Sequence, residues 1–341
     1  MKNSEVFYNQ LYTWYELNRR VLPWRETEDA YHIWVSEIIL QQTRVDQGLP
    51  YYLRFVERFD DVKRLACASE DEVLRYWQGL GYYSRARNMH KAAQVIVSEH
   101  GGVFPTDFAS IRALPGIGDY TAGAISAFAY NMPYPALDGN VYRVLSRLYD
   151  CEIAFDTSAG KKHFHALAEE LLDREHARLF NSAIMEFGAL YCVPQSPECA
   201  CCPLREFCMA QAHNTVNLLP VRKPRTALRD RYLNYDIYLC EQDGTLKTLI
   251  QQRTGNDIWK HLWEFPLHET TEHEAPGELP SIEMTHILSH QRLHARFNIH
   301  KVSALTSIEG TQTVSWEDLD NYAFSRLTLK ALEKFGTPHR S

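Results

Sequence analysis

The sequence predicts a protein of two domains, the first all-α and the second α+β. Apolar residues recur at three-to-four spacing through most of residues 4–112 and again through 158–189, as in amphipathic helices. The composition changes after Asn214. From Tyr232 onward, short runs rich in aromatic and branched residues lie between turn residues, as in strands. A chain of 341 residues also exceeds the usual length of one domain.

The composition excludes several classes of protein. Hydrophobic residues make up 45% of the chain, but no apolar run approaches the length of a membrane-spanning helix, so we expect no membrane partner. The N-terminus has an early acidic residue and no signal-peptide core, which predicts a cytoplasmic protein. The net charge of −7 opposes non-specific coating of nucleic acid, so any nucleic-acid binding must depend on local patches.

The first helical region contains a carboxylate in an unusual place. The run Leu22-Pro23-Trp24-Arg25 interrupts the first helix, and Glu37 follows in the next one with apolar residues on both sides. Apolar surroundings raise the pKa of a carboxyl group, as a general acid near neutral pH requires. The alternatives are that Glu37 lies on an exposed helix face and that Trp24 and Arg25 are a packed ring beside a solvated charge.

A glycine turn at residues 78–88 precedes another helix. Tyr82 and Arg85 lie just beyond Gly79 and Gly81. Arginines can hold phosphates while an aromatic ring enters a base stack. A capped helix with buried tyrosines explains the same residues equally well.

The stretch from Leu114 to Asn140 combines a second glycine turn with a downstream carboxylate. Gly116 and Gly118 precede a helical run, and backbone N–H groups at a helix start suit a phosphate. Asp138 begins the next helical run, where the helix dipole favours the ionised form. This combination indicates an enzyme acting on a nucleic-acid backbone or sugar, although a plain turn before a helix remains possible.

Five of the eight cysteines lie between residues 192 and 208. Clustering in a chain without a secretion signal favours a metal site over disulfides. Four thiolates can hold an iron–sulfur cluster or a zinc ion, and we take them to be Cys192, Cys199, Cys202 and Cys208. Cys201 spoils the spacing and is interpreted as a bystander.

The second half begins with a basic, proline-containing stretch at residues 221–231, expected to be a solvated linker or a phosphate-tracking segment. We predict domains at 1–215 and 232–341, joined by a linker at 216–231. Strands are expected at 235–240 and 246–250 as a hairpin, at 287–288 and at 294–302. A helix is expected at 325–335.

Taken together, these motifs resemble the adenine DNA glycosylases of the MutY type, in the endonuclease III superfamily. The resemblance rests on residues 22–25, 36–43, 79–88, 114–125 and 137–141 and on the four-cysteine loop. Residues 251–266 resemble that family's Nudix-like domain without the catalytic Nudix signature. The implied fold is an all-α helix-hairpin-helix glycosylase domain with an iron–sulfur cluster loop, followed by an α+β Nudix-like lesion-recognition domain.

The resemblance implies a monofunctional DNA glycosylase of base excision repair. Its substrate would be double-stranded DNA containing adenine mispaired with 8-oxoguanine or guanine, and the protein would act as a monomer. Glu37 would protonate adenine, Asp138 would stabilise or trap the sugar cation, and Asn140 and Tyr120 would assist. Relatives that also cut the backbone carry a lysine at the position of Tyr120. One [4Fe–4S] cluster would occupy the cysteine loop.

The resemblance also implies where DNA is contacted. Gln42 and Tyr82 would enter the duplex, and the amides near the hairpin glycines would grip a phosphate. The full set of implied DNA contacts is Arg25, Gln42, Thr43, Tyr82, Arg85, Gly116 and Gly118. Ser289 and His290 would read 8-oxoguanine.

Three positions depart from the family pattern. Leu288 replaces an aromatic residue before Ser289, so recognition of the lesion is expected to be weaker or differently built. Ser182 replaces a longer polar residue near the adenine. Asp119 places a negative charge beside the phosphate grip, and it either caps the helix facing outward or weakens binding.

Three competing interpretations remain at this stage. The first is a bifunctional pyrimidine-lesion glycosylase and lyase of the endonuclease III kind, which a lysine at position 120 and a missing second domain would mark. The second is a non-enzymatic DNA-binding redox sensor. The third is a zinc protein.

Overall fold

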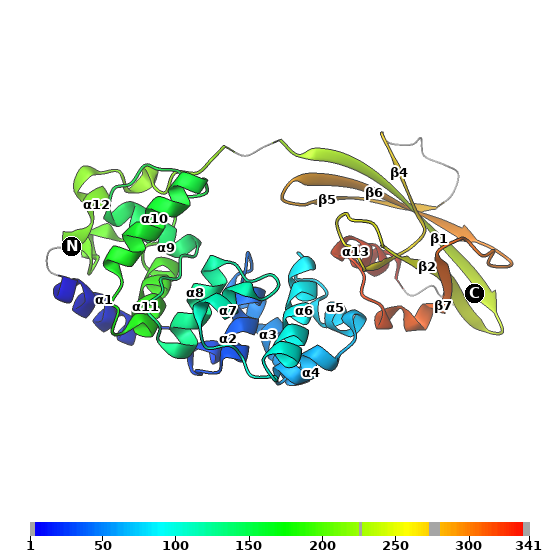
Figure 1. Ribbon diagram of the computed structural model, residues 1–341. Helices are drawn as coiled ribbons and strands as arrows, with labels where there is room; N and C mark the ends of the chain where they lie inside the picture. The colour runs from blue at the N-terminus through cyan, green and yellow to red at the C-terminus, as the bar shows by residue number, and fades with distance from the viewer. Residues whose placement is uncertain (1–3, 225–226, 273–279, 337–341) are drawn as a thin grey trace. The chain divides into compact units, whose positions relative to one another are not determined.

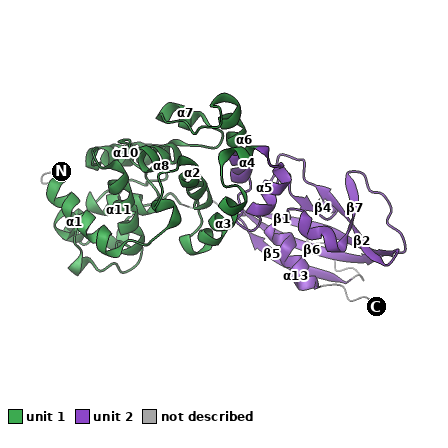
Figure 2. Ribbon diagram, turned by 90° about the horizontal axis from the view of Figure 1, so that it is seen from below, with its two compact units in different colours: residues 1–66, 91–224 green, residues 67–90, 225–341 purple. Residues whose placement is uncertain are grey.

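A computed structural model describes residues 4–224, 227–272 and 280–336. The chain forms two compact units, residues 1–66 with 91–224 and residues 67–90 with 225–341 (Figure 2). The second unit therefore includes a segment from inside the expected first domain. Within the described ranges, no helix is long and apolar enough to cross a bilayer.

The first unit is helical (Figure 1). Short polar side chains start several of its helices: Asp29 accepts a hydrogen bond from the His32 N–H, and Asp107 accepts one from the Ser110 N–H. The unit contains α1 (Ser4–Asn18), η1 (Pro23–Arg25), α2 (Ala30–Ile39), α3 (Val45–Arg58), α4 (Val62–Cys67, whose last residue belongs to the second unit), α7 (Phe108–Ala113), α8 (Asp119–Tyr130), α9 (Gly139–Leu148), α10 (Ser158–Leu171), α11 (Ala177–Leu190), η2 (Cys199–Cys201), η3 (Arg205–Phe207), α12 (Met209–His213) and η4 (Val216–Leu218).

The apolar faces of α1, α9, α10 and α11 form a core of this unit. Phe7, Val144, Phe164, Phe180 and Phe187 are almost completely buried in it. Burying one such side chain stabilises the fold by about 1.5–3 kcal/mol. This core holds α9 and α11, which both contribute to the site described below.

The second unit contains a seven-stranded mixed sheet in the order β3-β2-β1-β6-β5, with β4 paired to β1 and β7 paired to β2. Strands β1 and β6 are parallel and the other pairs are antiparallel. Its elements are α5 (Glu70–Trp77), the first residues of α6 (Ser84–Glu99), β1 (Arg229–Gln242), β2 (Thr245–Gln252), β3 (Trp263–Glu264), β4 (Leu267–Thr270), β5 (Ser281–Ile287), β6 (Gln291–Lys301), β7 (Thr311–Ser315), η5 (Trp316–Asn321) and α13 (Arg326–Phe335).

The predicted hairpin is present, with a turn at Asp243-Gly244, and so is the predicted C-terminal helix. Strand β5 lies at 281–287, so Leu288 falls in the turn after it and not in a strand. Strand β1 begins at Arg229, inside the expected linker, because Arg231 is drawn into an ion-pair network and is only 8% exposed. Residues 225–226 of that linker lie outside the described residues.

The segment 67–90 is held to the sheet unit by polar contacts. The Tyr83 hydroxyl donates to the carbonyl of Phe324 at 3.3 Å, and Arg87 Nη1 donates to the carbonyl of Lys260 at 2.7 Å. Gln252 Nε2 donates to Asp71 Oδ1 at 3.3 Å. The glycine turn at residues 78–88 and residues 225–341 therefore belong to one compact unit.

Candidate active site

A cavity of about 860 Å³ in the first unit brings many of the predicted site residues together. It is lined by residues of η1 and the segment before it, the end of α2 and the loop to α3, the start of α8, the start of α9 and the end of α11. Among the predicted residues it contains Arg25, Glu37, Gln42, Thr43, Tyr120, Asp138 and Asn140. Residues more than a hundred positions apart in the sequence therefore line the same cavity.

Glu37 lies inside α2 and is only 4% exposed. The Tyr120 hydroxyl donates a hydrogen bond to Glu37 Oε2 at 2.6 Å. Burial raises the pKa of Glu37 above its ordinary value, although the charge of Arg25 and the bond from Tyr120 act in the opposite direction. A carboxyl group with a raised pKa holds a proton nearer to neutral pH, as a general acid must.

Asp138 is the N-cap of α9, and its oxygens accept three hydrogen bonds. The N–H groups of Asn140 and Val141 each donate to Oδ1 at 2.8 Å, and Asn140 Nδ2 donates to Oδ2 at 2.8 Å. Burial nevertheless raises the pKa of Asp138, and these bonds act against that effect. Desolvation therefore opposes the effect of the helix start and its N–H groups, which favour the ionised carboxylate.

The two glycines of the hairpin between α7 and α8 do not line this cavity. Gly116 has a φ of 77°, which favours glycine, whereas Gly118 has an ordinary φ of −96° and caps α8. Both glycines are exposed. Asp119 is also exposed and forms an ion pair with Arg112 Nε at 2.5 Å, so its charge is paired within the hairpin.

The four predicted cysteine ligands line a second, smaller cavity in the first unit, and Cys201 is exposed and does not line it. Across the described ranges, no group of three or more histidine, cysteine, aspartate or glutamate side chains is arranged to hold a metal ion. Arg147, only 2% exposed, donates from Nη1 to Cys192 Sγ at 3.3 Å. A buried cation beside a set of thiols suits metal-bound thiolates, so the donor chemistry fits a soft metal centre.

Helix α9 connects the catalytic cavity to the cysteine loop. Its first residues carry the bonds to Asp138, and Arg143 Nη2 donates to Asn140 Oδ1 at 2.9 Å. Arg143 Nε donates to the carbonyl of Cys192 at 2.8 Å. A continuous set of hydrogen bonds thus runs from Asp138 through Asn140 and Arg143 to Cys192.

The remaining predicted DNA contacts lie in the second unit. Tyr82 lies in the turn before α6, where its φ is 48° and its side chain is exposed, with a relative accessibility of 46%. The guanidinium of Arg85 lies 5.3 Å from the Trp77 ring centre and 5.5 Å from that of Tyr82. Burial lowers the pKa of Arg85 to about 10. Arg85 therefore packs beneath Tyr82 within its own unit.

Sequence reasoning missed several residues of the catalytic cavity. Arg20 Nε and Nη2 donate to the two carboxylate oxygens of Glu186 at 2.7 and 2.8 Å, and both residues line the cavity. Ser182 is buried and does not line it. The pairing joins positions 166 apart, so no local pattern announces it. Glu186 lies one helical turn beyond Ser182 on α11. This spacing from a position expected near the adenine is the sequence signal that could have pointed to Glu186 as a cavity residue.

Comparisons with known families and solved structures agree with this architecture. Residues 35–173 match the family of HhH-GPD superfamily base excision DNA repair proteins, and residues 237–334 match the NUDIX domain. A solved thermostable thymine-DNA glycosylase aligns over 62% of this chain and 98% of its own, with a TM-score of 0.56 and 28% identity. An endonuclease III–DNA complex covers 63% of this chain and 99% of its own at 21% identity and a TM-score of 0.53, which supports the fold alone.

The sequence relatives extend over both units. The adenine DNA glycosylase of Buchnera aphidicola subsp. Schizaphis graminum (strain Sg) is 32% identical over 329 residues, covering 93% of this chain and 94% of the relative. The one of Mus musculus is 31% identical over 400 residues, covering 97% and 78%. Because both matches include the second unit, they favour this family over the endonuclease III branch. The chain belongs to the adenine DNA glycosylase family, and it is a DNA glycosylase of base excision repair.

Proposed function

We propose that this enzyme hydrolyses the N-glycosidic bond of adenine mispaired with 8-oxoguanine or guanine in double-stranded DNA. One observation carries the proposal: buried Glu37, bonded to Tyr120, shares a cavity with Asp138, the cap of α9. Two carboxyl groups in different surroundings can divide the roles of acid and anion. The names of the relatives support adenine as the base removed.

Glu37 begins the reaction as the general acid. It transfers its proton to N7 of the flipped-out adenine while the bond between N9 and C1′ breaks and its electron pair moves to the base. Neutral adenine leaves and positive charge develops on the sugar. Protonation by a positioned acid contributes typically 10²–10⁴-fold to such a rate.

Asp138 and water complete the reaction. The carboxylate of Asp138 faces the developing cation at C1′ and stabilises it or bonds to it. A water molecule then attacks C1′ and gives a proton to Glu37, and any bond from C1′ to Asp138 breaks with its electron pair returning to the carboxylate. The acid is restored and an abasic site is left. Asn140 assists by fixing the orientation of Asp138 through its side-chain amide.

Tyr120 limits the enzyme to base removal. A lysine amine at this position could attack C1′ and form a Schiff base, whereas a phenol bonded to Glu37 cannot. We therefore expect little strand cleavage. Borohydride trapping of a stoichiometric covalent adduct with DNA at neutral pH would contradict this assignment.

The remaining predicted residues would bind DNA. Gln42, with a φ of 58°, and Thr43 would contact the duplex beside the cavity, together with Arg25. The backbone amides at Gly116 and Gly118 would hold a phosphate. Tyr82, supported by Arg85, would enter the base stack, and Ser289 and His290 would read the base opposite adenine.

Cys192, Cys199, Cys202 and Cys208 would hold one [4Fe–4S] cluster. When bound, the cluster supplies a crosslink of four thiolates that fixes the loop between α11 and α12. Arg147 would offset its negative charge, and Arg143 would carry the position of the loop to Asn140.

The test is base release from four duplexes, with adenine opposite 8-oxoguanine, guanine, cytosine or thymine. The expected order places 8-oxoguanine and guanine well above the two pyrimidines. The variants Glu37→Gln and Asp138→Asn should lose release from every duplex while retaining binding. Equal activity on all four duplexes would contradict the proposed specificity, and full activity of either variant would contradict the assigned chemistry.

A further inference from the structure

A cavity of about 380 Å³ lies within the second unit, and none of the catalytic residues named above lines it. Three segments form its walls: the glycine turn at residues 79–84 with Arg87 of α6, residues 257–259 of the loop after β2, and residues 286–290 at the end of β5 and in the turn to β6. Arg326 at the start of α13 also lines it.

The walls of this cavity combine aromatic rings with hydrogen-bonding groups. Tyr82 and Trp259 contribute rings, and Ser289 and His290 contribute polar atoms that lie 3.1 Å apart (Oγ to Nδ1). Both Ser289 and His290 are exposed at the rim. Proteins hold a nucleobase in this way, with a ring against its face and donors or acceptors along its edge.

Trp259 has a backbone conformation that a side chain ordinarily avoids. Its φ is 58°, and that of His261 is 67°. A left-handed conformation is strained at a non-glycine residue, and such strain gathers at ligand sites. The Trp259 ring is only half-buried and lies 6.1 Å from the ring of His286, centre to centre. The Trp259 indole therefore lies at the cavity wall and is not buried in the core.

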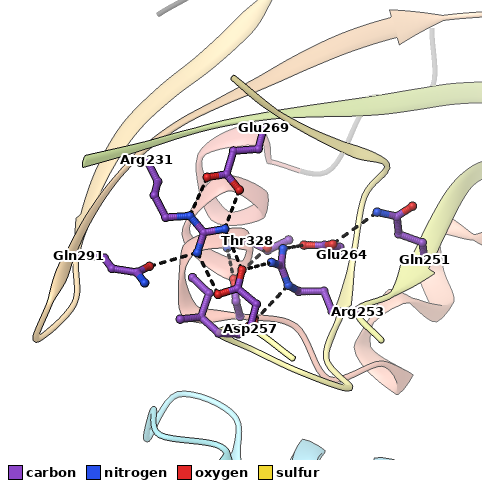
Figure 3. Close-up of polar contacts among 10 residues, drawn as sticks. Arg231, Gln251, Arg253, Asp257, Glu264, Glu269, Gln291 and Thr328 are labelled. Atoms are coloured by element: carbon purple, nitrogen blue, oxygen red, sulfur yellow. Dashed lines mark hydrogen bonds and ion pairs between the residues drawn. The ribbon is translucent and has the colours of Figure 1, made fainter. Parts of the chain in front are cut away.

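Arg231 fixes two of the three walls at once (Figure 3). Its guanidinium donates to both oxygens of Asp257 at 3.0 and 2.7 Å, and to both oxygens of Glu269 at 2.7 and 2.6 Å. Its Nη1 also donates to Gln291 Oε1 at 3.2 Å. Asp257 lies two residues before Trp259, and Gln291 directly follows His290. One buried cation thus sets the loop that carries the indole and the turn that carries the polar groups.

The third wall is fixed to the same loop. Arg87 Nη1 donates to the carbonyl of Lys260 at 2.7 Å, directly after Trp259. The turn bearing Tyr82 and the loop bearing Trp259 are therefore joined by a charged hydrogen bond. The rings of Tyr82 and Trp259 therefore lie on neighbouring walls of this cavity, and these walls are hydrogen-bonded to each other.

We propose that Trp259 is a specificity-determining residue of this enzyme, whose indole stacks on the base that stood opposite the excised adenine. The inference rests on the proposed function and deepens it. Leu288 offers no ring at the position before Ser289, and Trp259 supplies an aromatic surface from a different loop of the same cavity. Ser289 and His290 then meet the edge of the base, and Tyr82 lies on the neighbouring wall.

The experiment measures binding by the full-length Glu37→Gln protein, which does not turn over. Two duplexes are compared, one with adenine opposite 8-oxoguanine and one with adenine opposite an abasic site, where no base can enter the cavity. The variants are Trp259→Leu, which keeps apolar bulk without a ring, and Trp259→Phe, which keeps a ring. Asn256→Ala is the matched control, because Asn256 is exposed on the same loop and does not line the cavity.

Stacking of a base on a side-chain ring is worth about 1–3 kcal/mol, so Trp259→Leu should bind the 8-oxoguanine duplex at least about fivefold more weakly. Trp259→Phe should recover most of this loss, and Asn256→Ala should bind as the parent does. Neither substitution should change binding to the abasic duplex. Equal loss on both duplexes, or no loss on the first, would overturn the proposal. Failure of the proposed function itself would be seen separately, as absence of adenine release by the unsubstituted protein.

Discussion

Glu37 and Asp138 line the same cavity, yet they accept different hydrogen bonds. The charge of Asp138 is met by three donors at 2.8 Å, two of them backbone N–H groups at a helix start. Glu37 accepts one bond, from Tyr120 at 2.6 Å, among apolar neighbours. Burial raises the pKa of both groups, but the donors around Asp138 favour its anion more strongly. This difference supports the proposed roles, in which Glu37 carries the proton and Asp138 the negative charge.

Removing the Tyr120 hydroxyl should shift the pH dependence of the reaction. The bond from Tyr120 acts to lower the pKa of Glu37, so Tyr120→Phe should raise that pKa further. Because the acid works only while protonated, the rate of base removal falls as pH rises through this pKa. The alkaline limb of the single-turnover rate should therefore move to higher pH in the variant.

The matched control for this prediction is Tyr134→Phe. Tyr134 stacks on Phe108 at 4.3 Å between ring centres and does not line the catalytic cavity. Its profile should overlay that of the parent enzyme. A Tyr120→Phe limb displaced to lower pH would show that the hydroxyl does not act on Glu37 as described.

At the scale of the element, the hairpin between α7 and α8 offers two glycines with different requirements. Gly116 needs a left-handed backbone at a φ of 77°, whereas Gly118 does not and has open space where a Cβ would project. Gly116→Ala should strain the turn by about 1–2 kcal/mol. We expect weaker DNA binding and a smaller dependence of that binding on salt, because a phosphate contact is lost.

Gly118→Ala serves as the comparison, since it adds the same methyl group without changing the backbone. Binding should be measured for both variants across a series of salt concentrations. If Gly116→Ala binds with the affinity and salt slope of the parent, the turn does not grip a phosphate.

Of the two arginines of α9 that bond to the cysteine loop, Arg147 makes the larger number of hydrogen bonds. Arg147 donates to the carbonyls of Cys192, Val193, Pro194 and Val216 as well as to Cys192 Sγ. Arg147→Met leaves these buried acceptors without that donor, at about 1–3 kcal/mol for each group left unpaired. We expect less iron per chain, weaker visible absorbance and a lower unfolding temperature.

Arg174→Met is the control for Arg147→Met. Arg174 is exposed and pairs with Glu169, an interaction worth about 0–1 kcal/mol. Its iron content should match that of the parent. Normal iron content in Arg147→Met would mean that the loop does not depend on this guanidinium.

At the scale of the whole molecule, the second unit is made from two distant parts of the chain. A fragment ending at residue 224 would keep α5 and the glycine turn but lose the acceptors at Phe324 and Lys260. Exposed apolar surface and unpaired polar groups should lower the unfolding temperature of this fragment below that of the full chain. Scanning calorimetry of both proteins tests this, and an unchanged helical transition would contradict it.

The sequence was most informative where function depends on local patterns. The apolar flanks of Glu37 mark it as a candidate acid, and the two glycines of the hairpin mark it as a candidate phosphate-binding turn. Both signals lie within a few residues of sequence. The bond between Arg20 and Glu186 and the network around Arg231 join residues far apart, and periodicity contains no information about such pairs. The short strands β3 and β4 were also missed, because two to four residues are too few to reveal alternation.

The membership of residues 67–90 in the sheet unit affects how the protein is made. During synthesis this segment leaves the ribosome early, but the Tyr83 hydroxyl bonds to a residue 241 positions later and Glu70 pairs with one 191 positions later. Domains usually fold as units from the N-terminus, and distant pairings form slowly. The nascent chain must therefore hold Glu70 and Tyr83 without these partners until almost the whole protein has been translated. That interval is when a chaperone would protect this enzyme most.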